Sequence, residues 1–175
     1  MNTDKITLRP INDDDTPLLY QIYASTRADE LKMVSFWSDA QKEAFTQQQF
    51  SAQSLHYFSV HYAYREYSII LFEGKPAGRL FLDCAPGEIR VVDIALLPEF
   101  RGLGIGEYLL REVLDRAARN GDLVVIHVER MNRAKQLYER VGFKVVEAVS
   151  DIYLRMECRP ILSENEKEVL STREE

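Results

Sequence analysis

The segment Arg101–Gly106 reads Arg-Gly-Leu-Gly-Ile-Gly, with a glycine at every second position. It follows a strand-like run that ends near Leu97 and precedes a helix-like run that begins near Ile105. Glycines leave backbone N–H groups unshielded by side chains, and a helix N-terminus adds unpaired N–H groups and the positive end of its dipole. The segment therefore predicts a strand-to-helix turn that can hold a pyrophosphate.

The glycine spacing separates this turn from two better-known phosphate-binding motifs. The dinucleotide fingerprint requires G-x-G-x-x-G and an acidic residue about 20 residues further on, whereas the spacing here is G-x-G-x-G. No Gly-Lys-Ser/Thr follows, so a P-loop is excluded. A tight connection without a ligand is the structural alternative, and a nicotinamide-dependent oxidoreductase is a further alternative that this spacing disfavours.

Two longer blocks of sequence extend the argument. Glu88–Gly106 contains the turn, and Asn132–Phe143 reads Asn-Arg-Ala-Lys-Gln-Leu-Tyr-Glu-Arg-Val-Gly-Phe. In that order, the two blocks closely resemble the GNAT superfamily of N-acetyltransferases. The first is similar to its coenzyme A pyrophosphate loop, [Arg/Gln]-x-x-Gly-x-Gly, and the second to its Ala-x-x-Leu-Tyr-Glu-x-x-Gly-Phe helix. The resemblance is specific over residues 88–143 and only architectural over the rest.

Length and composition indicate one globular domain. A chain of 175 residues with 46% hydrophobic and 29% charged residues can bury a substantial core. We expect an N-acetyltransferase domain over residues 1–159 and a polar tail over 160–175 that is partly disordered or a short helix. The first ten residues lack the apolar core of a secretory signal, and two cysteines form neither a metal spacing nor a disulfide framework. These features favour a cytoplasmic location.

The hydrophobic periodicity predicts alternating strands and helices. Strands are expected at Ile6–Arg9, Tyr67–Phe72, Lys75–Asp83, Glu88–Leu97, Leu123–Val128, Phe143–Val149 and Asp151–Met156. Helices are expected from Asp13–Asp15 to about Ser25, from Ser38 to about Ser54, over Ile105–Asn120 and over Ala134–Val141. This order predicts an α+β fold with a mixed central sheet of about six or seven strands and about four helices. The resemblance implies that the fourth and fifth strands splay apart to admit the cofactor.

The resemblance implies a binding mode for acetyl-CoA, used as the acyl-donor cosubstrate. Its phosphates would lie on the backbone amides of Gly102–Glu107, with Arg101 shaping the turn. The strand edge Ile94–Leu96 would offer backbone groups to the pantetheine arm and one N–H to the thioester oxygen. The candidate cofactor-binding residues are Ile94, Ala95, Leu96, Arg101, Gly102, Leu103, Gly104, Ile105, Gly106, Glu107 and Asn132.

Asn132 departs from the family pattern. The family asparagine usually precedes the tyrosine of the helix by seven positions, whereas Asn132 precedes Tyr138 by six. Met131 occupies the expected place. Asn132 is therefore a candidate either for contact with the pantetheine or for the N-cap of the following helix.

Acetyl transfer to an amine requires a base, because an amine of lysine type has an unperturbed pKa of about 10.4. His127 is our first candidate, since it lies late in the fifth strand, where amino-terminal acetyltransferases of the superfamily carry a base; its alternative is a structural hydrogen bond. Asp93 is the second candidate, and it either lines the cleft or pairs with an arginine. Glu129, acting through water, is a third.

Tyr138 is the candidate general acid. The resemblance places its hydroxyl beside the cofactor sulfur, where it would protonate the departing thiolate. The alternative is a tyrosine on an apolar helix stripe whose hydroxyl finds any acceptor. No cysteine lies in either block, so direct attack in a ternary complex is favoured over a covalent intermediate.

The acceptor region is rich in aromatic residues. These are Phe36, Trp37, Phe45, His56, Tyr57, Phe58, His61, Tyr62 and Tyr64, with Asp29 and Glu30 nearby to meet a cation. Aromatic residues at this density also form cores, so the acceptor stays open between a small amine and a peptide or lysine.

The sequence thus predicts an acetyl-CoA-dependent N-acetyltransferase, with a non-catalytic acyl-CoA-binding or interaction module of the same fold as the alternative. The net charge of −6 disfavours nucleic acid as a partner, and no apolar run is long enough for a membrane span. No metal site is expected, and the expected oligomeric state is open between a monomer and a homodimer.

Overall fold

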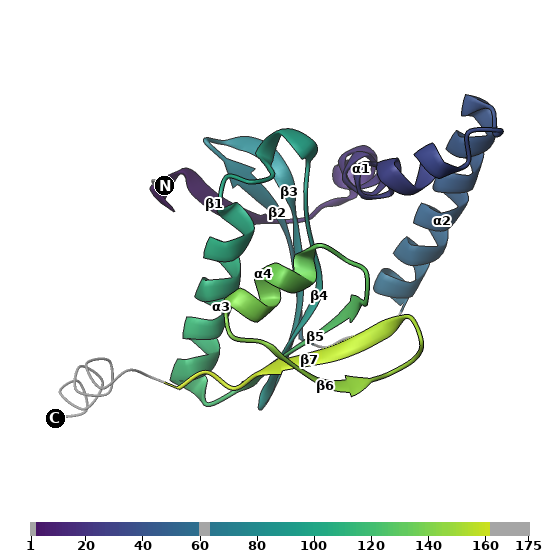
Figure 1. The fold of residues 1–175 in the computed structure, drawn as a ribbon. Coiled ribbons are helices and arrows are strands. Elements are labelled where there is room, and N and C mark those ends of the chain that lie inside the picture. The colour runs from purple at the N-terminus through teal and green to yellow at the C-terminus, as the bar shows by residue number, and fades with distance from the viewer. Residues whose placement is uncertain (1–2, 60–63, 162–175) are drawn as a thin grey trace, which may run out of the picture. The chain divides into compact units, whose positions relative to one another are not determined.

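The computed structural model describes residues 3–59 and 64–161 (Figure 1). Its α-helices are α1 (Thr16–Met33), α2 (Asp39–Ser59), α3 (Ile105–Asn120) and α4 (Ala134–Arg140). Its strands are β1 (Ile6–Pro10), β2 (Arg65–Phe72), β3 (Lys75–Ala85), β4 (Glu88–Leu96), β5 (Leu123–Glu129), β6 (Lys144–Ala148) and β7 (Tyr153–Cys158). Short 3-10 turns lie at Thr3–Lys5, Asp13–Asp15 and Pro98–Phe100.

The seven strands form one mixed sheet in the order β1-β2-β3-β4-β5-β7-β6. β4 and β5 are parallel, whereas β1 pairs with β2, β5 with β7 and β6 with β7 in antiparallel fashion. The parallel register joins Glu88–Val91 to Leu123–Ile126, so it ends before either strand does. The predicted α+β fold with an open mixed sheet is confirmed. No helix within the described ranges is both long and apolar enough to cross a membrane.

The first two helices are longer than the sequence indicated. α1 was expected to end near Ser25 but continues to Met33, and α2 continues to Ser59. Serine and threonine usually weaken a helix because their hydroxyls compete for backbone groups. In α1, however, Ser25 Oγ donates to the Ile22 carbonyl (2.7 Å) and Thr26 Oγ1 donates to the Tyr23 carbonyl (2.7 Å), so both hydroxyls are satisfied within the helix.

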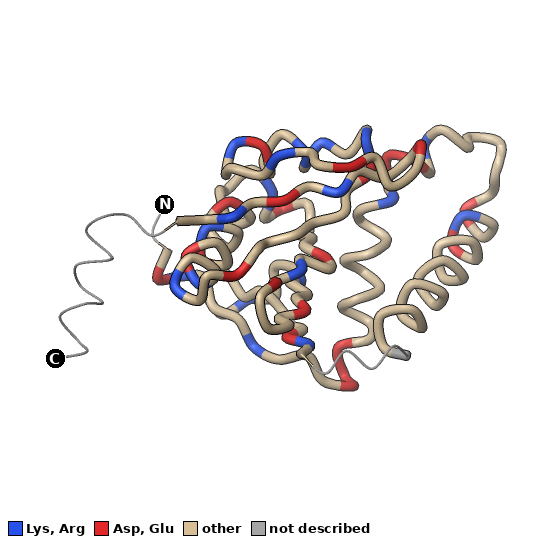
Figure 2. The backbone as a smooth tube through the Cα atoms, turned by 90° about the horizontal axis from the view of Figure 1, so that it is seen from below, with Lys and Arg blue, Asp and Glu red and all other residues tan. Residues whose placement is uncertain are grey.

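The chain divides into two compact units, which are described separately. The first unit comprises Met1–Phe81 and Asp93–Leu103, and the second comprises Leu82–Val92 and Gly104–Glu175. β3 and β4 therefore contribute residues to both units. Acidic and basic residues are interspersed along the backbone (Figure 2).

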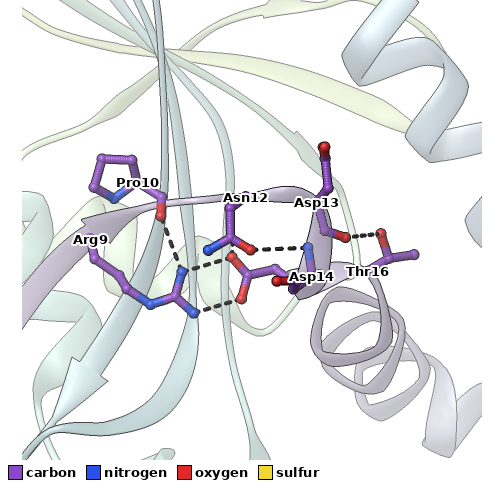
Figure 3. A network of polar contacts seen from close by, with 7 residues as sticks. Arg9, Pro10, Asn12, Asp13, Asp14 and Thr16 are labelled. Atoms are coloured by element: carbon purple, nitrogen blue, oxygen red, sulfur yellow. Dashed lines mark hydrogen bonds and ion pairs between the residues drawn. The ribbon is translucent and has the colours of Figure 1, made fainter.

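In the first unit, the connection from β1 to α1 is fixed by a buried carboxylate. Asp15, only 5% exposed, accepts hydrogen bonds from both terminal nitrogens of Arg9 (2.7 and 2.6 Å) and from the backbone N–H of Asn12 (2.9 Å). Asn12 Oδ1 in turn accepts from the Asp14 N–H (3.0 Å), which completes a capping box before α1 (Figure 3). The direction in which α1 leaves the sheet is thereby set.

Also in the first unit, α1 and α2 lie side by side (Figure 1). The Phe50 ring of α2 packs against Tyr20 and Tyr23 of α1, with ring centroids 5.4 and 5.8 Å apart. Ile22 of α1 packs against Ala95 at the end of β4. The helix pair is thus anchored to the strand that leads into the glycine turn.

In the second unit, α3 packs against β5. The helix buries a stripe at helical spacing, made of Ile105, Leu109, Leu110, Val113, Leu114 and Ala117. The strand contributes the buried residues Val124, Val125, Ile126 and Val128. α3 ends as expected at Gly121, which has a left-handed conformation and donates its N–H to the last carbonyls of the helix.

Candidate functional site

The turn between β4 and α3 has a backbone that requires glycine. Gly102 and Gly104 have φ values of 74° and 79°, in the left-handed region, where a side chain costs about 1–2 kcal/mol. Gly104 is the N-cap of α3 and contributes no side-chain hydrogen bond to the helix. The first N–H groups of α3 therefore lack an acceptor within the helix. This combination gives the turn a local excess of backbone donors suited to an anion.

Arg101 braces the start of this turn. Its Nε donates to the Leu96 carbonyl (2.8 Å), and its Nη2 donates to the hydroxyl of Ser25 (2.8 Å) and to the Ser25 carbonyl (3.2 Å). The side chain thus folds back onto the end of β4 and onto α1. These contacts support the expected role of Arg101 in shaping the turn.

The end of β4, residues Ile94–Leu96, is held close to β3. The Leu97 N–H donates to the Ala77 carbonyl (2.9 Å). A Cβ atom at Gly78 would lie 2.2 Å from the Ala95 carbonyl oxygen, so only glycine permits this approach. Sequence reasoning missed Gly78, although a lone glycine inside a strand is a known signal of close backbone approach.

Asp93 takes the second of the two roles open to it, because it pairs with an arginine. Arg79 Nη2 lies 2.5 Å from Asp93 Oδ2, and Arg79 is 3% exposed. The same nitrogen of Arg79 donates to Gln53 Oε1 (2.9 Å), and the guanidinium lies 5.3 Å from the centre of the Phe81 ring. Sequence reasoning missed Arg79, since an arginine within a strand is usually taken for a surface residue.

His127 lies on β5 in the second unit, and its side chain is exposed. Its cross-strand partner on β7 is Arg155. Partial desolvation, and then the positive charges of Arg90 and Arg155, lower the pKa of His127, while Glu88 and Glu147 act in the opposite direction. The imidazole is therefore neutral near pH 7 and has the protonation state that a general base needs. The third candidate, Glu129, accepts a hydrogen bond from the Tyr153 hydroxyl (3.3 Å).

Tyr138 lies on α4 and is 5% exposed. Its ring packs edge-on against Phe143, with centroids 6.1 Å apart. α4 lies beside the first turn of α3, because a Cβ atom at Gly106 would be only 3.6 Å from the Leu137 side chain. Tyr138 therefore sits on a helix that packs next to the start of α3.

An ion pair joins the same two helices. Arg140 of α4 reaches Glu107 in the first turn of α3 (3.1 Å), and Arg111 contacts the same carboxylate (2.8 Å). Hydrogen bonds from Arg111 and Arg140 lower the pKa of Glu107. The side chain of Glu107 is thus occupied by arginines, which leaves its backbone N–H as the group that can meet a ligand.

Asn132 lies two residues before α4, and Arg133 is the N-cap of that helix. Its Oδ1 accepts a hydrogen bond from the Ala134 N–H (2.9 Å), and its carbonyl accepts from the Lys135 N–H (3.0 Å). Met131, at the position where the family has its asparagine, is 93% exposed. The expectation that Asn132 is the N-cap of α4 is therefore wrong by one residue, although its side chain accepts a hydrogen bond from the first residue of the helix.

The aromatic residues expected in the acceptor wall fall into separate groups. A cavity of about 300 Å³ in the first unit lies between α1 and α2 and is lined by Tyr23, Arg27, Glu30, Leu31, Val34, Trp37, Phe45, Thr46 and Gln49. Of the expected residues, Glu30, Trp37 and Phe45 line this cavity. Tyr57 and Phe58 instead pack on Phe81 of the core.

The other expected wall residues lie elsewhere or outside the described residues, and Tyr64 is 50% exposed. Phe36 is 80% exposed and meets Trp37 edge-on. His61 and Tyr62 lie outside the described residues. In the part of the chain that the structure describes, no group of three or more His, Cys, Asp or Glu residues is arranged to hold a metal ion.

The mixed sheet and the glycine turn that opens α3 define an acetyltransferase-like fold. A family description of the GNAT acetyltransferase domain matches residues 58–145, half of the chain. The chain belongs to the GNAT acetyltransferase family.

Individual relatives agree with this assignment. The alanine N-acetyltransferase of ribosomal protein bS18 from Haemophilus influenzae is 31% identical over 67 residues, which are 38% of this chain and 46% of that protein. The chain thus matches less than half the length of this curated relative.

Solved structures share the fold. The PaiA N-acetyltransferase from Thermoplasma acidophilum, in complex with coenzyme A, superposes with a TM-score of 0.66 at 19% identity, covering 88% of this chain and 98% of that one. The ribosomal-protein-S18-alanine N-acetyltransferase from Escherichia coli gives a TM-score of 0.58 at 19% identity, covering 91% and 97%.

Proposed function

We propose that this protein is an acetyl-CoA-dependent N-acetyltransferase that transfers the acetyl group to a primary amine by direct attack in a ternary complex. The observation that carries the proposal is the glycine turn in a member of the GNAT family. Gly102 and Gly104 adopt left-handed conformations there, and α3 begins without a side-chain cap. A turn of this kind fits an anionic pyrophosphate better than it fits any neutral ligand.

The proposed cofactor contacts follow the backbone. The N–H groups of Gly102–Glu107 would hold the pyrophosphate, and the backbone of Ile94–Leu96 would hold the pantetheine arm. Gly78 permits the close approach to Ala95, and Arg101 donates to the Leu96 carbonyl, so both residues help to position Ile94–Leu96. That a structural neighbour was solved with coenzyme A supports this assignment.

The proposed chemistry uses one base and one acid. The neutral His127 would accept a proton from the acceptor's ammonium group, directly or through water. The amine would then attack the thioester carbonyl, whose developing oxyanion a β4 backbone N–H would stabilise. Tyr138 would give its proton to the departing thiolate. Because Asp93 is already paired with Arg79, we assign it a structural role in preference to that of base.

The acceptor that we propose to test first is the α-amino group of a protein. The relative that is 31% identical is named for acetylating an alanine of a ribosomal protein. A substrate of this kind would also place the enzyme in the cytoplasm. The cavity between α1 and α2 would then take a side chain near the amino terminus.

An acetyl-transfer assay tests the proposal. The full chain is mixed with acetyl-CoA and three acceptor sets: peptides with a free alanine terminus, the same peptides with a blocked terminus and an internal lysine, and small polyamines. Release of coenzyme A is followed with a thiol reagent. We expect release that depends on the acceptor and falls in Tyr138→Phe and His127→Gln. Tight binding of acetyl-CoA without release for any acceptor would favour the non-catalytic module.

A further inference from the structure

In the second unit, His127 lies on one face of the sheet among charged side chains. Cross-strand partners share a face of a sheet. Ile126 is paired with Met156 on β7, and both are buried, so they define the covered face. His127 is the next residue along β5 and points to the other face, together with its partner Arg155.

The register places further charges on that face. Glu147 on β6 is opposite Arg155, so it shares the face of His127. On β4, Arg90 is opposite Val125, two residues before His127 on the same side of β5. Glu88 lies two residues before Arg90 and therefore on this face as well. Strands β4, β6 and β7 thus each contribute charged side chains to the face of the sheet that carries His127.

Glu88 links the two arginines across β5. Its Oε1 lies 3.1 Å from Nη2 of Arg90, and its Oε2 lies 3.9 Å from Nη2 of Arg155. Since Glu88 is on β4 and Arg155 is on β7, with β5 between them, this contact passes over β5. Arg155 is also held by Glu157 (2.7 Å). Both guanidiniums are therefore fixed close to the surface of the strand that carries His127.

The charges facing His127 oppose one another. Arg90 and Arg155 are positive, Glu88 and Glu147 are negative, Glu157 is bound to Arg155, and Glu129 lies two residues further along β5. Partial burial is the largest cause of the lowered pKa of His127, and among the charged side chains the two arginines have a larger effect than the acids. The acids alone would raise the pKa.

We propose that Arg155 and Arg90 are positioning residues for the reaction, held over β5 by Glu88 so that the imidazole of His127 stays neutral and accepts the proton of the acceptor amine. This inference rests on the proposed function, in which His127 is the base. The proton moves from the ammonium nitrogen to an imidazole nitrogen, and the freed lone pair then attacks the thioester. Arg90 has the larger effect of the two, and Arg155 is the direct cross-strand neighbour of His127.

The first test reads His127 without any need for activity. The pKa of its imidazole is measured by NMR titration of the full chain, with the signal assigned by its loss in His127→Gln. We expect the pKa to rise toward the ordinary value in Arg90→Gln, to rise somewhat less in Arg155→Gln and to fall in Glu147→Gln. Arg119→Gln, an exposed change on α3, is the matched control and should leave the pKa unchanged. Backbone spectra of each variant confirm that it is folded.

The second test asks whether the charged neighbours of His127 affect catalysis. The acidic limb of the kcat/KM profile should move to higher pH in Arg155→Gln, by the same amount as the pKa measured by NMR. An unchanged His127 pKa in Arg155→Gln would overturn the inference and leave the proposed function standing. A shifted pKa with an unmoved acidic limb would show that His127 is not the base, and would overturn the inference together with that part of the proposed function.

Discussion

Arg101 Nη2 donates a hydrogen bond to Ser25 Oγ at 2.8 Å, which ties the turn after β4 to the middle of α1. Ser25 lies between Tyr23 and Arg27, two residues that line the cavity of the first unit. The segment proposed to hold the cofactor and the helix proposed to meet the acceptor are thus joined by one side chain.

This contact predicts that Ser25 affects cofactor binding. Ser25→Ala removes one hydrogen bond to a charged group, and we expect acetyl-CoA to bind about five-fold more weakly, or about 1 kcal/mol. Arg101→Ala, which removes the bonds to both Ser25 and Leu96, should weaken binding further. Calorimetry measures both. Ser51→Ala, which removes a similar bond within α2, is the control and should bind normally.

The left-handed glycines give a second prediction. Gly104→Ala should destabilise the protein by about 1–2 kcal/mol and also weaken acetyl-CoA binding, because the turn must change shape to relieve the side chain. Gly121→Ala, at φ 75°, should cost similar stability at the other end of α3. Urea unfolding and calorimetry on the pair separate strain from binding. Equal loss of binding in both variants would count against a cofactor role for the turn.

The ion pair between the buried Arg79 and the half-buried Asp93 makes a third prediction, on stability. Arg79→Met leaves the Asp93 carboxylate without its partner, and removal of one member of a buried pair costs about 3–5 kcal/mol. Lys32→Met removes a surface partner of Asp29 and should change stability by at most about 1 kcal/mol. Chemical unfolding measures the difference. An Arg79→Met protein as stable as Lys32→Met would show that the ion pair contributes little.

Much of the fold could be predicted from the sequence. The parts of the candidate site that could not be predicted depend on contacts between residues distant in sequence. The start and end of α3 followed from glycines at both ends, where the backbone itself demands them. The partner of Asp93 could not be chosen, because Arg79 is distant in sequence and only the fold brings it close. The aromatic wall divided into cavity and core residues for the same reason, since composition carries no information about the face on which a ring lies.

Acid should weaken the contacts that Asp15 makes with Arg9 and Asn12 before α1. The pKa of Asp15 is lowered, first by the hydrogen bonds from Arg9. A carboxyl group with a lowered folded-state pKa stabilises the protein above its unfolded pKa, and that stability is lost as the pH falls through the folded value. The stability advantage of the native chain over Asp15→Asn should therefore be full at pH 7 and shrink below about pH 4.

A urea unfolding series from pH 7 to pH 3 tests this prediction. Asp13→Asn, an exposed change in the same turn, is the control and should follow the native chain at every pH. If the difference in unfolding free energy between Asp15→Asn and the native chain stays constant with pH, the ionised Asp15 carboxylate does not stabilise the protein as predicted.

Tyr138→Phe should separate chemistry from binding. Phenylalanine keeps the packing against Phe143, so we expect acetyl-CoA affinity to be retained while kcat falls. Tyr108→Phe on α3 is the matched control and should leave kcat unchanged. Steady-state kinetics with a saturating acceptor measures kcat for both variants. An unaltered kcat in Tyr138→Phe would show that this tyrosine is not the general acid.

Calorimetric titration of acetyl-CoA into the full chain tests the central claim most directly. The account predicts saturable binding at one site per chain, weakened in Gly104→Ala and retained in Gly121→Ala. A titration that produces no binding heat at any accessible concentration, with the protein shown to be folded, would contradict it.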